Sequence, residues 1–249
     1  MSGKGRTIKK RKPLRPSTVL LQIFLVIWAV IQLFPLYWML TFSLKSNAEI
    51  FGGNIIGLPQ EWQWSNYTYV FNQGHLGRYF LNSVVVSALT IFFTLFLSSM
   101  ATYALVRLKW RLCRAVYLLF LVGMMIALHA VLLPLYVNLQ PVMGTRVSLV
   151  LPYTAFALPM SILLMVGSLE SIPKEMEEAA FIDGASIYMI FFKIIIPVLV
   201  PILSTVAIIV FLDSWNELML AMTFINDEAR MTLTVGVNNM IGKYHTKWG

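Results

Sequence analysis

SIPKEMEEAAFIDGASIYMIFFKIIIP, residues 171–197, is a polar interruption between two long apolar runs, and it holds four of the chain's 11 acidic residues. Pro173 fits the first turn of a helix, where a missing N–H leaves no hydrogen bond unmade. The three glutamates that follow lie in the early turns, where the helix dipole favours negative charge. The stretch therefore predicts a short, water-exposed helix over about residues 173–182.

The residues after this helix predict a tight turn and a second helix. Asp183-Gly184 can end the first helix, because glycine readily takes the left-handed conformation that closes helices. Ser186 can cap a second helix that leads into the next apolar segment. Small Ala179 and Ala180 leave the middle of the first helix free of bulk, so that another surface can approach its backbone closely.

The spacing of residues across this stretch matches a known signature. Glu178-Ala179-Ala180, three residues, Gly184, nine residues and Ile194-x-Ile196-Pro197 resemble the signature loop of permease subunits of binding-protein-dependent ABC importers, which more often have leucine where Ile196 stands. In that family the loop forms a coupling helix that docks in a cleft of the cytoplasmic ATPase subunit. An ordinary polar loop between helices is the alternative interpretation. The resemblance implies an ATPase-coupling loop that contains Glu177, Glu178, Ala179, Ala180, Asp183, Gly184 and Pro197.

Composition excludes a soluble globular protein. The 249 residues are 58% hydrophobic and only 12% charged, with a mean hydropathy of +0.75, which leaves too little polar surface to cover a soluble globule. The single cysteine, Cys113, excludes an internal disulfide. The net charge of +8 follows the membrane topology, so we expect contact with membrane lipid and none with nucleic acid.

The apolar runs set the order of the segments. Residues 1–17 are basic and predict a disordered cytoplasmic tail, and residues 18–42 are long enough to cross the membrane. Residues 43–79 form a polar external connector whose aromatic residues suit the membrane interface or, alternatively, stacking on a sugar. Residues 80–249 form the core. The predicted segments of this core are spans at about 80–106, 115–137, 147–169 and 198–224, a coupling loop at 171–197 and an external C-terminal segment at 225–249.

The predicted fold is therefore an all-α integral membrane bundle of five transmembrane helices with a cytoplasmic coupling helix. Placing the N-terminus in the cytoplasm puts 13 of the 19 Lys and Arg residues inside and six outside, as the positive-inside rule requires. The same orientation brings the signature loop to the cytoplasmic side. Permeases of the resembled family normally add a sixth span, so the resemblance also implies that this helix is missing and that the sequence is truncated at Gly249.

No catalytic motif stands out. Residues 236–243 superficially resemble a phosphate-binding loop, but five residues separate the glycines where four are required, and Tyr244 stands where Ser or Thr would hold magnesium. We therefore expect no enzyme activity and no bound cofactor in this chain, with ATP and magnesium held by a partner subunit. His129 lies within a predicted span and is either part of a pathway or a partner in a hydrogen bond between helices.

A polar cluster interrupts the last predicted span. Asp213 and Glu217 lie one turn apart and share a helix face, which in lipid is costly unless it lines a bundle interior or an aqueous cavity. These two residues, and Asn82 in the second span, either border the translocation path or hold helices together, and the sequence favours neither interpretation. The candidate path residues are Asn82, Asp213, Trp215, Asn216 and Glu217.

The resemblance implies a permease subunit of an ABC importer of the sugar-uptake branch, in the bacterial cytoplasmic (inner) membrane. It implies three kinds of partner: a second permease subunit, a cytoplasmic ATPase dimer and an extracytoplasmic solute-binding protein. Two other classes stay open. An ion- or proton-coupled secondary carrier would use intramembrane ionisable residues as relay groups, and a membrane enzyme would need catalytic residues gathered at one membrane face.

Overall fold

The structure is a computed structural model that describes residues 16–72, 74–108 and 110–240, and within these residues every regular element is a helix. The all-α fold is therefore confirmed. The chain divides into two compact units, one reaching to Tyr69 and the other beginning at Val70. Most of the predicted basic tail, and the end of the predicted C-terminal segment from residue 241, lie outside the described residues.

The first unit contains α1 (Pro16–Ser43), α2 (Asn47–Phe51) and the start of α3 (Ser65–Asn72). A buried lysine orders its connector. The Lys45 ammonium donates to the backbone carbonyls of Asn54 at 2.6 Å and Ile55 at 3.2 Å. The Asn66 amide donates to the carbonyls of Ser43 and Lys45, both at 3.1 Å. Hydrogen bonds thus order the connector of residues 43–79, which the sequence predicts only as polar.

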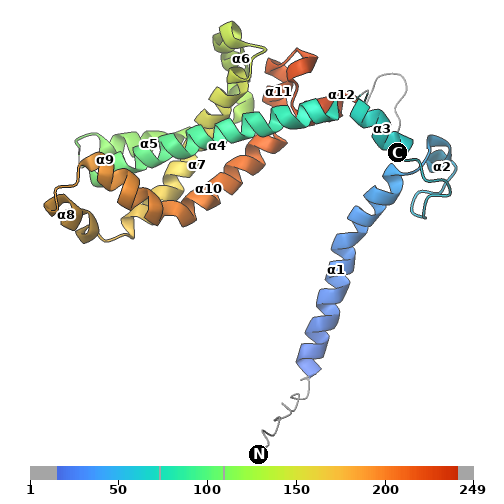
Figure 1. Cartoon of the computed structure of the whole chain (residues 1–249), viewed down its shortest axis with the longest axis horizontal. Helices are drawn as coiled ribbons and strands as arrows, with labels where there is room; N and C mark the ends of the chain where they lie inside the picture. Colours follow the sequence, from blue (N-terminus) through green and yellow to red (C-terminus); the bar gives the residue numbers. More distant parts are fainter. Residues whose placement is uncertain (1–15, 73, 109, 241–249) are drawn as a thin grey trace, which may run out of the picture. The chain divides into compact units, whose positions relative to one another are not determined.

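Three long helices make up the centre of the second unit. α7 (Val147–Glu170) packs along α4 (Leu76–Arg107), and α10 (Ile196–Asn216) packs against both, as Figure 1 shows. Small hydroxyl side chains recur at nearly every turn of one face of α4, where they let neighbouring helices approach closely. The buried members of this row are Ser83, Ser87, Thr90, Thr94, Ser98 and Thr102.

Within the described residues, four helical segments are long and apolar enough to cross a membrane, and a bent pair of helices can make a fifth span. α5 (Cys113–Gly123) and α6 (Leu128–Leu139, extended by η1, Gln140–Val142) meet at 102°. The bend falls within the span expected over 115–137. The helix tightens after Gly123, since the N–H of Met125 bonds the carbonyl three residues back at 3.0 Å, and Ala127 is extended with ψ 131°.

The last predicted span is also broken. The helix expected over 198–224 ends at Asn216, and α11 (Met219–Phe224) follows as a separate helix. Glu217 between them is extended, and its carboxylate accepts hydrogen bonds from the N–H groups of Leu220 at 2.9 Å and Ala221 at 3.2 Å. The break therefore gives the first turn of α11 a side-chain cap.

The remaining helices lie at the two ends of the bundle. α8 (Glu175–Ile182), α9 (Ile187–Ile190) and the π-helical η2 (Phe191–Ile195) connect α7 to α10 at one end. η3 (Glu228–Arg230) and α12 (Leu233–Met240) follow α11 and pack on the first turns of α4 at the other end (Figure 1).

Candidate functional site: the coupling loop and a membrane cavity

The signature stretch folds as a helix, a tight turn and a helix, as its sequence predicts. α8 begins at Glu175 and ends at Ile182 with Asp183 as its C-cap, and Gly184 then takes φ +83°, the left-handed conformation that glycine favours. The N–H of Ala185 bonds the Ala180 carbonyl at 3.0 Å, and so closes the turn. Ser186 caps α9 by accepting from the Met189 N–H at 3.3 Å.

A π-helical turn lies directly before Pro197. The proline has no N–H to continue the helical hydrogen bonds, and in η2 the N–H of Ile196 bonds the carbonyl of Phe191, five residues back. Pro197 then occupies the first turn of α10, where a missing N–H is tolerated. Ile196-Pro197, the pair that ends the signature, thus marks the point where the loop continues into the membrane-spanning helix α10.

One arginine fixes the loop to the bundle. Arg107, in the last turn of α4, donates from Nε to the carboxylate of Glu177 at 2.5 Å. Its terminal amino group donates to the carbonyls of Leu169 at 3.2 Å and Ile172 at 2.9 Å, at the C-terminal end of α7. The side chains of Arg107 and Glu177 are only 6% and 12% exposed. One guanidinium therefore joins α4, the end of α7 and α8.

The other signature residues of α8 face outward. Glu178, Ala179, Asp183 and Gly184 are exposed, whereas Ala180 is half-buried against the cluster that includes Leu169 and Ile190. Three large apolar side chains beside them are also mostly exposed: Phe181 at 68%, Ile182 at 86% and Tyr188 at 75%. No pattern in the sequence distinguishes these three residues, and a cluster of exposed apolar side chains of this size marks a contact surface.

A cavity of about 280 Å³ opens between the long helices toward the opposite end of α10. Asp213 and Glu217 both line it, together with Thr90 from α4 and Tyr153 from α7. The Tyr153 hydroxyl donates to the Glu217 carboxylate at 2.8 Å. The structure therefore brings the two predicted acids to one cavity, although Glu217 lies beyond the end of the helix rather than one turn along it.

Trp215 and Asn216 do not belong to this lining. The Trp215 ring packs on Phe80, with ring centroids 5.6 Å apart, and on Phe211 at 5.2 Å. The Asn216 amide donates to the carbonyl of Leu212 at 2.8 Å.

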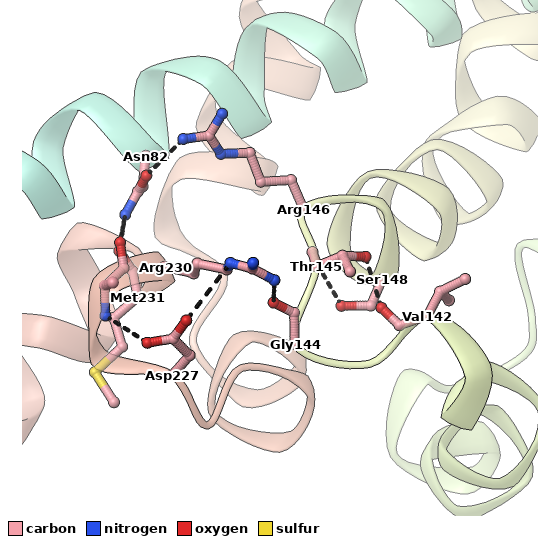
Figure 2. A network of polar contacts seen from close by, with 10 residues as sticks. Asn82, Val142, Gly144, Thr145, Arg146, Ser148, Asp227, Arg230 and Met231 are labelled. Atoms are coloured by element: carbon pink, nitrogen blue, oxygen red, sulfur yellow. Dashed lines mark hydrogen bonds and ion pairs between the residues drawn. The ribbon is translucent and has the colours of Figure 1, made fainter.

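Asn82 is the centre of a polar network that joins three distant segments (Figure 2). Its amide nitrogen donates to the carbonyls of Ala229 and Met231, each at 3.0 Å, and its oxygen accepts from Arg146 at 3.1 Å. Arg230 donates to the Gly144 carbonyl at 2.6 Å, and it pairs with Asp227 at 3.5 Å. The turn before α7 and the C-terminal segment predicted to be external thus meet at the same end of the bundle.

His129 is exposed on α6 and is not among the residues that line the cavity. In the part of the chain that the structure describes, no group of three or more His, Cys, Asp or Glu side chains is arranged to hold a metal ion.

The helical bundle and its outward-facing helix–turn–helix loop define the membrane component of an importer. Residues 94–246 match the family of the binding-protein-dependent transport system inner membrane component. The chain belongs to this family. It is a permease subunit of an ABC importer, a multi-pass membrane protein that is not itself catalytic, and such systems include ATPase and binding-protein partners.

Several relatives resemble the chain over most of its length. The probable ABC transporter permease protein YurM of Bacillus subtilis is 37% identical over 91% of this chain and 76% of its own. The diacetylchitobiose uptake system permease protein NgcG of Streptomyces coelicolor is 34% identical over 86% and 71%. The trehalose transport system permease protein SugB of Mycobacterium tuberculosis is 32% identical over 86% and 81%.

A solved structure has the same fold. The crystal structure of a bacterial ABC transporter involved in the import of the acidic polysaccharide alginate contains a chain that aligns with a TM-score of 0.81. The alignment covers 94% of this chain and 85% of that one, at 24% identity.

Proposed function

We propose that this permease imports a carbohydrate into the cytoplasm, with energy from ATP that a separate subunit hydrolyses. The observation that carries the proposal is the similarity to permeases named for diacetylchitobiose and trehalose, at 34% and 32% identity. The melibiose/raffinose/stachyose import permease protein MelC of Bacillus subtilis, at 31% identity, supports the same substrate class.

The proposed assembly contains a second permease subunit, a cytoplasmic ATPase dimer and an extracytoplasmic solute-binding protein, in the bacterial cytoplasmic membrane. The ATPase dimer binds ATP and magnesium. The distribution of basic residues supports a cytoplasmic N-terminus and a cytoplasmic signature loop. The exposed apolar side chains of Phe181, Ile182 and Tyr188 suit the loop for contact with the ATPase.

The coupling mechanism follows from how the loop is attached. Glu177, Glu178, Ala179, Ala180, Asp183, Gly184 and Pro197 form the proposed coupling loop. When the ATPase dimer closes and moves α8, the ion pair of Arg107 with Glu177 carries that movement to α4. The turn at Gly184 and the π turn before Pro197 carry it to α10.

Helix α10 connects the loop with the proposed translocation path. Asp213 lies 17 residues after Ile196, so the helix spans about 25 Å between the loop and the cavity at 1.5 Å per residue. Asp213 and Glu217 border the path at the cavity. Nearby, the Trp215 ring packs on Phe80. The Asn82 amide donates to the Ala229 carbonyl, and the Asn216 amide donates to a carbonyl of its own helix at the same end of the bundle.

The test is uptake by the importer reconstituted in vesicles with its ATPase, second permease and binding protein. Labelled trehalose, melibiose and diacetylchitobiose serve as probes. We expect uptake of at least one of them to require ATP and the binding protein and to persist when a protonophore collapses the proton gradient. Uptake that stops with the protonophore while ATP is maintained would favour the secondary carrier instead.

The variant Glu178→Lys tests the coupling loop in the same vesicles. The side chain is exposed, so the substitution should leave membrane insertion intact. We expect it to abolish ATP-driven uptake by placing a positive charge on the surface that contacts the ATPase. Normal uptake by this variant would contradict the assigned role of α8.

A further inference from the structure

The cavity at the far end of α10 has room for one sugar unit and is lined by five parts of the chain: α4, the bend between α5 and α6, α7, α10 and α11. Its volume is about 280 Å³. The bend between α5 and α6 contributes Ile126 and Leu128, and α7 contributes Phe156. These side chains, with Leu220, give the cavity apolar walls, which suit the C–H faces of a sugar ring.

One hydrogen-bonding group in the lining is both exposed and unused. The Asp213 carboxylate forms no hydrogen bond or ion pair with any residue that the structure describes. Thr90 also lines the cavity, but it is 0% exposed, and its hydroxyl is one of five buried hydroxyls that have no partner among the described residues. The group that the lining offers to a guest is therefore the Asp213 carboxylate.

The carboxylate of Glu217, the second acid of the cavity, already has hydrogen-bond partners within the protein. Glu217 accepts from the Tyr153 hydroxyl and from two backbone N–H groups, so its charge contributes to the field in the cavity while its oxygens hold the protein together. The described residues of the lining include two carboxylates and no Lys, Arg or His. The charged side chains among the described lining residues are therefore all negative.

We propose that this cavity is a binding subsite for one ring of a neutral, hydroxyl-rich sugar, and that its carboxylates select against acidic sugars; the inference rests on the proposed function. Asp213 accepts hydrogen bonds from neighbouring ring hydroxyls, and the apolar walls contact the C–H faces of the ring. A sulfonate or uronate group would meet Asp213 and Glu217 at close range, where like charges repel.

Cysteine accessibility tests the subsite directly in the reconstituted importer. The native thiol is removed by Cys113→Ser, and Ser214→Cys then places a thiol in the cavity lining while Asp213 stays in place. Ser204→Cys is the matched control, because Ser204 is an exposed serine on the same helix outside the cavity lining. We expect the sugar that the wild-type importer takes up to slow modification of the Ser214→Cys thiol by about tenfold and to leave the control unchanged.

Uptake kinetics test the charge selection. Asp213→Asn should raise the KM for the neutral sugar by about tenfold with a smaller effect on maximal rate, since one acceptor is lost. The wild-type importer should take up a neutral disaccharide and not sulfoquinovosyl glycerol, and Asp213→Lys should reduce that discrimination.

The outcomes separate the two proposals. Uptake of a neutral sugar with no protection of the thiol and no change in KM overturns the subsite and leaves the importer function standing. Preference of the wild-type importer for the sulfonated probe overturns the charge selection. Failure of an ATP-hydrolysing complex to take up any carbohydrate refutes the proposed function itself.

Discussion

Replacing Arg107 by methionine removes the guanidinium that joins α4, α7 and the coupling loop. The Glu177 carboxylate, 12% exposed, then loses its partner, and the carbonyls of Leu169 and Ile172 lose their donor. Breaking a buried ion pair from one side costs about 3–5 kcal/mol. This corresponds to a shift of roughly 150- to 4,000-fold toward a loop released from the bundle.

The assay is the ratio of sugar molecules imported to ATP molecules hydrolysed by the reconstituted complex. We expect Arg107→Met to lower this ratio strongly while ATP hydrolysis continues, because a released α8 no longer moves α4. Arg111→Met is the matched control, since Arg111 is an exposed basic residue in the neighbouring loop. The double variant Arg107→Met with Glu177→Met should recover part of the coupling, because it leaves no unpaired buried charge. An unchanged ratio in Arg107→Met, with correct assembly, would refute the role of this ion pair.

Three further substitutions test single features of the structure. In Gly236→Ala the new Cβ would overlap the Tyr79 ring, so the melting temperature of the solubilised protein should fall by an amount equivalent to about 1–3 kcal/mol. Gly77→Ala is the control, because a Cβ at Gly77 meets open space, and this variant should melt like the wild type. Gly184→Val forces a branched residue into φ +83°, and we expect ATP-driven uptake to be lost without loss of membrane insertion; retained uptake would mean that the turn tolerates strain. Asn82→Ala leaves the two carbonyls it serves unpaired, so protease cleavage after residue 224 should accelerate while the KM for sugar stays the same, and a raised KM would instead assign Asn82 to the path.

The sequence predicts the parts of this fold that depend on local pattern. Apolar length identifies the long helices, and the residues around Gly184 identify the turn, because glycine conformation and serine capping act within a few positions. The contacts of Arg107 and Asn82 are not local. Their partners lie 70 and up to 149 residues away, and no pattern along the chain pairs them. Arg107 ends a span beside an acidic loop, however, and this is a signal that a search for charge pairs could have used.

The helix breaks were missed for a different reason. An apolar run of span length looks the same whether it is straight or bent, so the 102° angle between α5 and α6 has no signature in composition. In the last span, the spacing of Asp213 and Glu217 favoured one continuous helix face. Glu217 instead bonds the N–H groups of the next helix, because a carboxylate at membrane depth is stabilised by donors within reach.

The two acids of the cavity should therefore respond differently to mutation. Glu217→Ala removes the cap of α11 and the partner of the Tyr153 hydroxyl, and loss of a cap alone costs about 0.5–2 kcal/mol. We expect a lower melting temperature and fewer assembled complexes, with an unchanged KM for sugar in the complexes that remain. Glu217→Gln keeps the acceptor oxygen and should recover most of this stability.

Asp213→Asn should show the opposite pattern, because the Asp213 carboxylate holds no part of the described protein together. We expect this variant to melt and assemble normally and to have a raised KM for sugar. If Glu217→Gln raised the KM as much as Asp213→Asn and melted like the wild type, the cap would be secondary and both acids would bind solute. If Asp213→Asn instead lowered the melting temperature, its carboxylate would be structural, and the cavity would lose the group on which sugar binding depends.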